Sequence, residues 1–342
     1  MTEFTTDLSV QIEGDLSSQI EGDFIAMLDE WFSLPEVYDD KLDSQIHAWY
    51  VNPPKVWPEK PYFSPSALGS CPRELYLKAK GAEKDNFRQP PHQSRQKKMG
   101  TLTGDMIQRE ILLIEKHYAK HTGNEPRFKF LRDDKGRPRF EEFAKANVKV
   151  SHNGETFNLS GSPDGIMQYT TDGGEVIRVG LEVKSKASTA AKTSAFSMRE
   201  PDESHIVQTQ CYAKMYGCDY YVILYVNLSK KGWAISDEDY AKTPDIRAFC
   251  LHVTEADKLA LLDKPASITK AVREGTPPPL SLDDWLFNNF KTACALDLSD
   301  EEYAELIEIN RKMQHSNLQA FKKRGYAEAI EFITEIRKGV SG

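Results

Sequence analysis

Two acids and a lysine lie where a pair of strands would bring them together. Asp164 follows a proline and precedes a glycine, and Glu182 and Lys184 belong to the alternating segment that begins at residue 176. The turn residues 172–174, Asp-Gly-Gly, lie between them and predict a β-hairpin with arms at 156–162 and 176–186. Pairing of the two arms would place Asp164 close to Glu182.

The alternation along the second arm predicts which side chains share a face. Val179, Leu181 and Val183 fall on one face of the strand, whereas Glu182 and Lys184 fall on the other, with Gly180 and Lys186. Two carboxylates at close range repel each other unless a cation lies between them, and oxygen ligands suit Mg²⁺ or Mn²⁺. Such an ion can orient a water molecule and stabilise charge on a phosphate, and Lys184 can assist either role.

The alternative is that Glu-x-Lys is a solvated ion pair on a strand, which is common. Pro163-Asp164-Gly165 at the strand end and Gly180, which leaves room for a close approach, favour the chemical interpretation. The residues therefore predict hydrolysis of a phosphodiester bond.

These residues resemble the signature of the PD-(D/E)xK nuclease superfamily. Asp164 after Pro163, and Glu182-Val183-Lys184 located 18 residues later, match its two parts. Gln208 and Tyr212, four residues apart on an expected helix, resemble the QxxxY motif of the RecB-like branch, which includes CRISPR-associated exonucleases and phage exonucleases.

The resemblance implies a role for each of these residues. Asp164 and Glu182 would hold the metal with the Val183 carbonyl, and Lys184 would orient the water. Gln208 and Tyr212 would position the scissile strand and support the lysine.

The resemblance also implies a third metal ligand on the helix before the hairpin. Gly100 matches the glycine of that helix, but Gly104 stands where an acid or histidine is expected. Asp105, Gln108 and Glu110 remain alternatives for the ligand.

Several basic residues are candidates for contact with DNA. Arg73, which is either a phosphate contact or a structural residue, is joined by Lys186 and His205. Residues 83–98 are polar and predict a surface loop, whose cations could also contact DNA: Arg88, Arg95, Lys97 and Lys98.

Cysteine usage is informative because the segment 63–76 is similar to the start of CRISPR-associated exonucleases, in which a cysteine binds an iron–sulphur cluster. Cys71 takes that position, but no close group of three cysteines follows near the C-terminus. We therefore expect no iron–sulphur cluster and a small, buried Cys71. The other cysteines are Cys211, Cys218, Cys250 and Cys294.

The charge is unevenly distributed along the 342 residues. The net charge is −8, yet residues 1–50 hold 12 acids and a single lysine, so the remainder carries a small positive charge. An acidic N-terminal arm, which contains the repeat 9–16 and 17–24, is expected to be partly disordered, or to bind a protein partner or cover a basic cleft. Residues 24–32 are apolar enough to dock as a short helix. Without a basic leader or an apolar run of about 18 residues, we expect a soluble protein in the cytoplasm, that of the host if phage-encoded.

The expected elements follow the order helix, three strands, helix, strand. They lie at 99–121, 147–152, the two hairpin arms, 202–217 and 220–228, followed by a turn at 230–233 into another strand, an edge strand at 247–253 and a helix at 254–274. Two amphipathic helices complete the chain, one opened by a capping box at Ser299 and one at 326–338.

This order predicts an α/β fold with a restriction-endonuclease-like core, a mixed sheet flanked by helices, and a helical C-terminal extension. The expected division is an arm and proline-rich connector at 1–60, a nuclease core at 61–275 and the extension at 276–342.

The sequence thus predicts a Mg²⁺- or Mn²⁺-dependent DNA exonuclease acting in DNA end processing, replication or recombination, and the resemblance implies a phage or bacterial origin. Two alternatives remain: a structure-specific endonuclease, and a non-catalytic DNA-binding or anti-defence module on the same fold. A homo-oligomer is left open, because no motif decides it.

Overall fold

The structure is a computed structural model that describes residues 3–229 and 232–340, with side chains from residue 16 to residue 339 within those ranges. Its contacts define two compact units. Unit 1 comprises Met1–Trp57, Gln89–Val148 and Ser160–Ala260, and unit 2 comprises Pro58–Arg88, Lys149–Leu159 and Leu261–Gly342. The domain boundaries expected at residues 60 and 275 stay predictions. No helix in the described ranges is both long and apolar enough to cross a membrane.

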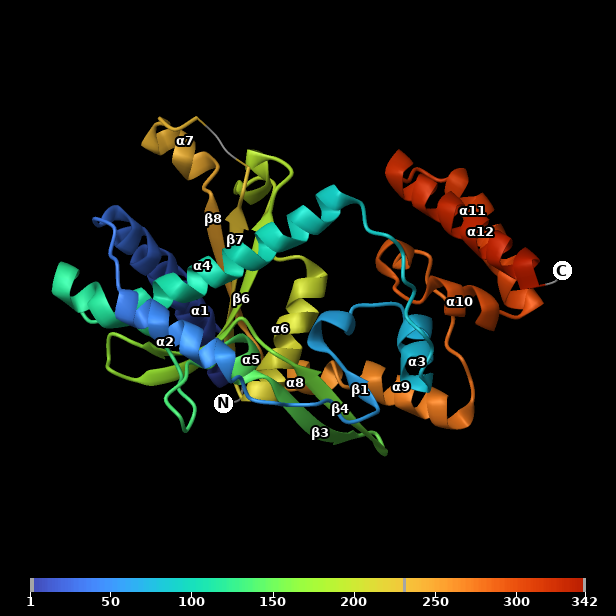
Figure 1. Ribbon diagram of the computed structural model, residues 1–342, viewed down its shortest axis with the longest axis horizontal. Coiled ribbons are helices and arrows are strands. Elements are labelled where there is room, and N and C mark those ends of the chain that lie inside the picture. Colours follow the sequence, from blue (N-terminus) through green and yellow to red (C-terminus); the bar gives the residue numbers. More distant parts are fainter. Residues whose placement is uncertain (1–2, 230–231, 341–342) are drawn as a thin grey trace. The chain divides into compact units, whose positions relative to one another are not determined.

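A five-stranded mixed sheet forms the centre of unit 1, in the order β2-β5-β6-β7-β8 (Figure 1). Its neighbours are antiparallel except β6 and β7, which are parallel. The strands are β2 (Phe128–Phe130), β5 (Gly165–Thr170), β6 (Val176–Lys186), β7 (Tyr220–Asn227) and β8 (Ile246–His252). The predicted edge strand at 247–253 is therefore confirmed as β8.

Helices cover both faces of this sheet. On one face, Ile107 and Ile111 of α4 (Pro91–Thr122) belong to the same buried cluster as Leu181 of β6. On the other, Tyr212 and Tyr216 of α6 (Glu203–Tyr216) join a second cluster with Tyr221 of β7 and Ile166. Helix α4, strands β2, β5 and β6, helix α6 and strand β7 follow in chain order, which confirms the expected fold class.

The hairpin forms with a different first arm from the one predicted. β6 pairs with β5, from Gly165 opposite Leu181 to Thr170 opposite Val176. The segment expected to be that arm is β4 (Glu155–Gly161), which instead pairs with β3 (Ala146–His152) and β1 (Tyr62–Phe63) in a separate sheet. Asn153 and Gly154, with φ values of 48° and 79°, form the tight reversal between β3 and β4. An Asn-Gly turn with two positive φ angles strongly favours pairing of the strands on either side of it.

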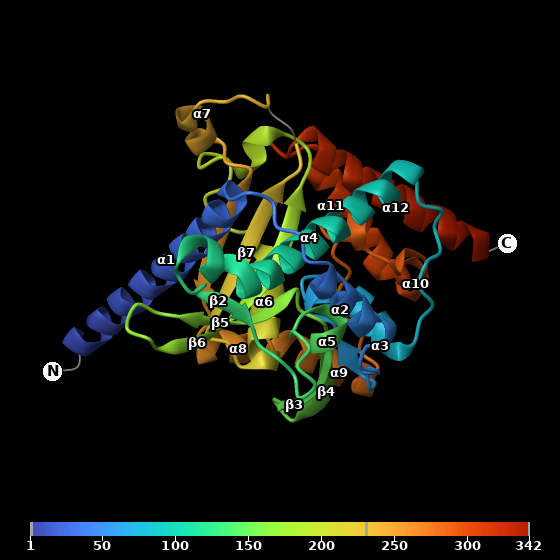
Figure 2. The same cartoon turned by 60° about the vertical axis from the view of Figure 1, so that its left-hand side comes forward.

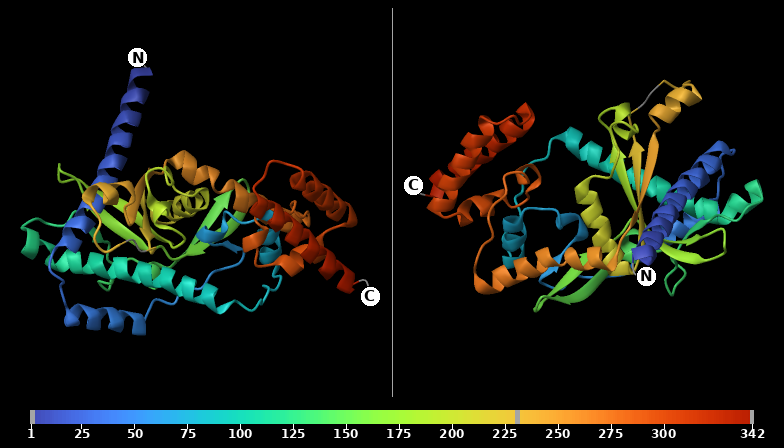
Figure 3. Two further views of the ribbon diagram at one scale, coloured as in Figure 1. Left: turned by 90° about the horizontal axis from the view of Figure 1, so that it is seen from above. Right: turned by 180° about the vertical axis from the view of Figure 1, so that it is seen from behind.

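The N-terminal segment is helical, so the prediction of partial disorder is wrong for residues 16–33. α1 (Glu3–Ser33) buries Ile20, Phe24 and Leu28 completely in the cluster that contains the α4 face of the sheet. The Glu21 carboxylate accepts a hydrogen bond from the backbone N–H of Cys250 in β8, at 3.1 Å. The docking helix expected at 24–32 is part of α1, whose first half projects past the sheet (Figure 3).

The remaining elements of unit 1 are short, apart from α2 (Asp40–Val51), which lies alongside α4 (Figure 2). They are α5 (Glu141–Ala144), a 3-10 helix at Ala190–Thr193, α7 (Asp237–Lys242) and α8 (Glu255–Ala260). Residues 91–98, expected in a loop, form the first turns of α4, because Pro91 at the first helical position has a backbone already suited to a helix. Residues 230 and 231 of the predicted turn lie outside the described ranges, and α7 occupies the place of the expected following strand.

Unit 2 is mainly helical. Its helices are α3 (Pro72–Lys80), α9 (Asp263–Glu274), α10 (Lys291–Asp297), α11 (Asp300–Gln314) and α12 (Ala320–Val340), with 3-10 helices at Pro65–Ala67 and Trp285–Phe287. The helix predicted at 254–274 is divided into α8 and α9. Pro265 has no N–H that could donate to the carbonyl of residue 261, so the helix is interrupted there. The capping box at Ser299 and Glu302 is confirmed.

Candidate active site

Asp164 lies directly before β5, beside the middle of β6. Its Oδ2 accepts a hydrogen bond from the backbone N–H of Val183 at 2.7 Å. Because Gly165 pairs with Leu181, the strand β5 begins one residue after Asp164, and Asp164 lies at the open edge of β6 next to Glu182. The two acids predicted to meet are therefore brought together, through β5 rather than through the expected strand.

Glu182, Lys184 and Gln208 form a closed set of polar contacts between β6 and α6. Lys184 Nζ lies 2.6 Å from Glu182 Oε1 and donates a hydrogen bond to Gln208 Oε1 at 3.0 Å. Gln208 Nε2 in turn donates to Glu182 Oε1 at 2.8 Å. Glu182 is buried, whereas about a fifth of the Lys184 side chain is exposed. The helix therefore fixes both members of the Glu-x-Lys pair and leaves the lysine accessible.

Tyr212, one turn along α6 from Gln208, bonds to the backbone two residues before Asp164. Its hydroxyl donates to the Ser162 carbonyl at 2.7 Å. Gly180 serves packing instead of a ligand approach, because a Cβ there would lie 2.0 Å from the Tyr221 ring. The room expected beside Glu182 is filled by this ring.

Burial shifts the pKa values of both acids upward. The pKa of Glu182 rises to about 8, because burial and the nearby charge of Asp164 outweigh the contacts from Lys184 and Gln208. Burial also raises the pKa of Asp164, against the hydrogen bond from Val183 and the charge of Lys184. A cation bound between the two acids would compensate for their charges.

The oxygen atoms at this edge fit a hard cation. Glu182 Oε2 is buried and has no hydrogen-bond partner in the described part of the chain. The Val183 carbonyl points to the same edge as its N–H, beyond the start of β5, since both groups of a strand residue face one side. Among the described residues, no group of three or more His, Cys, Asp or Glu side chains could hold a metal ion. Asp164, Glu182 and the Val183 carbonyl would hold Mg²⁺ or Mn²⁺ that keeps several waters.

Helix α4 presents Gln108 to the site. Its Nε2 donates to the backbone carbonyl of Asp164 at 2.8 Å. Asp105 is exposed one turn earlier, whereas Glu110 accepts a hydrogen bond from Trp31 of α1 at 2.8 Å. At 100° per residue, Glu110 projects some 200° around the helix from Gln108, so the two side chains face different sides of α4.

Glu141, at the start of α5, is a neighbour of the site that the sequence did not indicate. Its backbone N–H donates to the Pro163 carbonyl at 2.8 Å, and its carboxylate accepts from the Tyr50 hydroxyl at 2.7 Å. Burial raises the pKa of Glu141, and the charges of Asp105 and Asp164 raise it further. No signal in the sequence links it to Asp164, because β3 and β4 lie between them in the chain.

Two of the predicted phosphate contacts flank the lysine. Lys186 Nζ lies 2.5 Å from Asp202 Oδ2, and His205 Nδ1 lies 2.8 Å from the Tyr225 hydroxyl. Burial and the charge of Lys184 lower the pKa of His205 to about 4, so it is neutral near pH 7. The roles of both residues in DNA binding stay predictions.

The other predicted cations on α4 are exposed. Arg95, Lys97 and Lys98 lie on its first turns. A Cβ at Gly100, the next turn, would be 3.2 Å from Ser185 Oγ of β6, so these turns approach the strand that carries Glu182 and Lys184.

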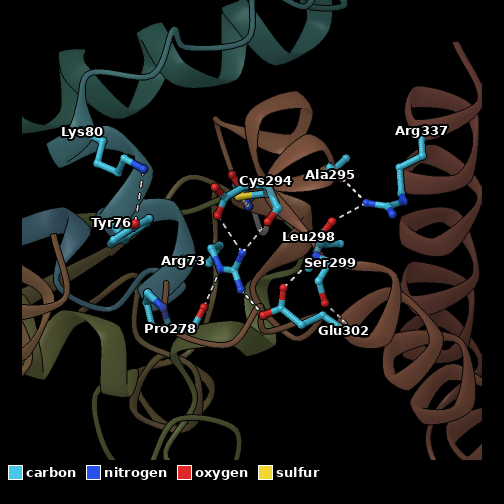
Figure 4. Close-up of polar contacts among 12 residues, drawn as sticks. Arg73, Tyr76, Lys80, Pro278, Cys294, Ala295, Leu298, Ser299, Glu302 and Arg337 are labelled. Carbon is cyan, nitrogen blue, oxygen red and sulfur yellow. Dashed lines mark hydrogen bonds and ion pairs between the residues drawn. The ribbon is translucent and has the colours of Figure 1, made fainter. Parts of the chain in front are cut away.

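Arg73 has a structural position within unit 2, so its prediction as a DNA contact is wrong. The side chain has no exposed surface and pairs with Asp297 and with Glu302, and Figure 4 shows the contact with Glu302. Its Nε donates to the Pro278 carbonyl at 2.5 Å, and its Nη1 lies 2.7 Å from Asp297 Oδ2. The guanidinium thus joins α3 to α10 and α11 and offers nothing to a phosphate. Cys71, beside it, is buried as predicted.

Comparisons with known proteins give distant matches among solved structures. No family model matches the chain, and no curated protein matches it. The chain is similar to the crystal structure of SSO0001, with a TM-score of 0.38 and 12% identity over 75% of this chain and 95% of that one. It is also similar to an alkaline exonuclease (LHK-Exo) from Laribacter hongkongensis, with a TM-score of 0.34 and 11% identity over 63% and 89% of the chains. The same exonuclease in complex with dAMP gives a TM-score of 0.34 and 11% identity over 62% and 88%. These likenesses are too distant to assign a family.

Proposed function

We propose that this chain is a metal-dependent deoxyribonuclease that works as an exonuclease in DNA end processing, replication or recombination. The observation that supports this most is the meeting of Asp164, Glu182 and Lys184 at one edge of the sheet, with Gln208 bonded to the latter two. Two acids with raised pKa values beside an accessible lysine are suited to hydrolysis of a charged ester.

Each residue has a defined part in the proposed reaction. Mg²⁺ or Mn²⁺, when bound, supplies Lewis-acid stabilisation of charge on the scissile phosphate. Lys184 Nζ orients the attacking water and stabilises the negative charge that builds on phosphate oxygen. Gln208 keeps Glu182 and Lys184 in place, and Tyr212 fixes the Ser162 carbonyl so that Asp164 stays at the open edge.

The first test compares end-labelled linear DNA with covalently closed circles, in Mg²⁺, Mn²⁺ or EDTA. We expect degradation of linear DNA with metal, and sparing of circles. Lys184→Ala should lower the rate by about 100-fold or more, because removal of one group that stabilises transition-state charge typically costs that much. Lys149→Ala changes an exposed lysine of unit 2 and serves as the matched control.

The alternatives give different results in the same assay. Cleavage of closed circles would replace the exonuclease proposal with a structure-specific endonuclease. DNA binding without cleavage of either substrate would favour the non-catalytic module. Equal rates for the wild type and Lys184→Ala would contradict the proposed mechanism.

A further inference from the structure

A cavity of about 620 Å³ lies between α2 and α4 in unit 1, next to the candidate active site. Its walls include the apolar side chains of Ile46, Leu112 and Phe140 and the ring of Tyr50. This volume lies within the range of pockets that hold small organic ligands, about 300–1,000 Å³. Its apolar walls suit the faces of a ring.

The polar lining of the cavity includes several hydrogen-bond acceptors beside the donors of His47, Thr101 and Arg109. Gln108 is 2% exposed, lines the cavity, and its Oε1 has no hydrogen-bond partner among the described residues. Asp105 and Glu141 line the same space. Buried polar atoms in proteins nearly always have a partner, so the Gln108 oxygen is available to accept a hydrogen bond from a donor bound beside it.

The charges of the cavity disfavour a phosphate. Asp43 joins Asp105 and Glu141 among the lining residues, and it holds the Arg109 guanidinium with hydrogen bonds of 2.8 and 3.0 Å. A phosphate entering here would meet three carboxylates and a cation that is already paired. A neutral ring with amino groups avoids this repulsion.

Two residues that line the cavity form hydrogen bonds to the segment that carries Asp164. Gln108 Nε2 bonds to the Asp164 carbonyl, and the Glu141 N–H bonds to the Pro163 carbonyl. A group bound in the cavity would therefore lie next to the proposed site of phosphate hydrolysis.

We propose that this cavity receives the terminal nucleobase of the DNA substrate and favours bases that carry an exocyclic amino group. Cytosine presents an amino donor where uracil and thymine present a carbonyl acceptor, which would face the Gln108 oxygen and the carboxylates. This inference rests on the proposed nuclease function, because the base must be delivered by a DNA end.

The first arm of the test measures nucleoside binding without catalysis. Deoxycytidine and deoxyuridine, which differ in the group at the 4-position of the ring, are titrated into the full chain in EDTA and followed by ligand-detected NMR. We expect deoxycytidine to bind roughly threefold to tenfold more tightly, as one net hydrogen bond allows. Ile46→Trp should fill the cavity and abolish the difference, whereas Ile46→Val should keep it.

The second arm measures cleavage of duplexes that differ only in a terminal dC or dU. The wild type should release the terminal dC faster by a similar factor, and Ile46→Trp should release both at the wild-type rate for dU. If Ile46→Trp loses cooperative thermal unfolding, His47→Trp, at an exposed lining position, replaces it.

The two arms separate the failure of this inference from failure of the proposed function. Equal binding of the two nucleosides, or a preference that both filling variants keep, would overturn the base pocket while leaving the nuclease intact. Selective nucleoside binding by a protein that cleaves no DNA would overturn the nuclease and retain the cavity as a nucleoside site.

Discussion

Glu182 combines burial, a cationic partner and a nearby acid. Lys184 and Gln208 both contact Glu182 Oε1, whereas Glu182 Oε2 has no partner among the described residues. Its pKa of about 8 means that the buried carboxylate is stabilised when it binds a proton or a cation.

This pKa predicts how the stability of the metal-free protein depends on pH. Between the unfolded value of 4.5 and the folded value of about 8, the folded state holds more protons than the unfolded state. The free energy of unfolding should therefore fall as pH rises from 5 to 8, by at least about 1 kcal/mol. Urea denaturation in EDTA at several pH values measures the slope.

The matched variant for this prediction is Glu182→Gln, which cannot titrate. Its slope should be shallower, with a remainder from Asp164, whose pKa is also raised. Glu175→Gln, at an exposed position, should behave as the wild type. The same slope in all three proteins would show that Glu182 does not hold a proton in the folded state.

At the residue scale, the sequence identified those site residues that form a local pattern. Glu182 and Lys184 follow from a strand period of two, Asp164 from the turn after the preceding strand, and Gln208 with Tyr212 from the resemblance to the QxxxY motif. Glu141 could not be found this way, because its backbone bond to Pro163 depends on how the chain returns after β3 and β4. Glu110 was a candidate by proximity in sequence, and it faces a different side of α4 from Gln108, where it bonds to Trp31.

At the scale of elements, the lack of a side chain at Gly180 of β6 makes room for the Tyr221 ring of β7. Gly180→Ala would place a methyl group 2.0 Å from the Tyr221 ring, which is completely buried and cannot move away freely. We expect a loss of about 1–3 kcal/mol in the free energy of unfolding, the usual cost of overpacking a core. Gly173→Ala, in the hairpin turn with its nearest atom at 3.7 Å, is the control and should change stability little. Equal stabilities of the two variants would show that the sheet adapts to the methyl group.

The first turns of α4 predict a measurable electrostatic contribution to DNA binding. Replacing Arg95, Lys97 and Lys98 together by alanine should reduce the slope of log affinity against log salt by up to about 0.9 for each phosphate that these cations neutralise. Fluorescence anisotropy with a duplex at several salt concentrations measures this slope. A triple variant with an unchanged slope would place the DNA elsewhere on the protein.

The elements themselves were predictable where an apolar stripe recurred along a helix, as in α4, or where an apolar run was long, as in β7. The error in the hairpin was the choice of partner for β6, which was expected to be β4 and is β5. The Asn153-Gly154 turn assigns β4 to β3, and Pro163 interrupts the chain before β5 begins, so a strand that looked continuous with the hairpin belongs to another sheet.

At the scale of the whole molecule, α1 is a structural part of unit 1. Phe24 has no exposed surface and packs edge-on against Phe128 of β2, with ring centroids 5.0 Å apart. We expect Phe24→Ala to cost about 3–5 kcal/mol, the range for removing a buried aromatic side chain. Phe32→Ala, on the same helix with 51% of its side chain exposed, should cost far less. Thermal unfolding of both variants tests this, and comparable melting temperatures would contradict a core role for α1.

The charge of the N-terminal segment concealed this role. Its many acids suggested disorder, yet Ile20, Phe24, Met27, Leu28 and Trp31 share a buried stripe along the helix. A helix can carry acids on one face and core residues on the other, so net charge alone does not decide between an arm and a core element.

The contact between Glu21 and the backbone of Cys250 spans 229 positions of the chain. During synthesis from the N-terminus, α1 leaves the ribosome long before its partner strand β8 exists. Contacts that join distant parts of a chain form slowly, and until then the apolar stripe of α1 stays exposed. Helix α1 therefore completes its packing only after β8 has been synthesised, whereas its contact with Phe128 of β2 can form earlier.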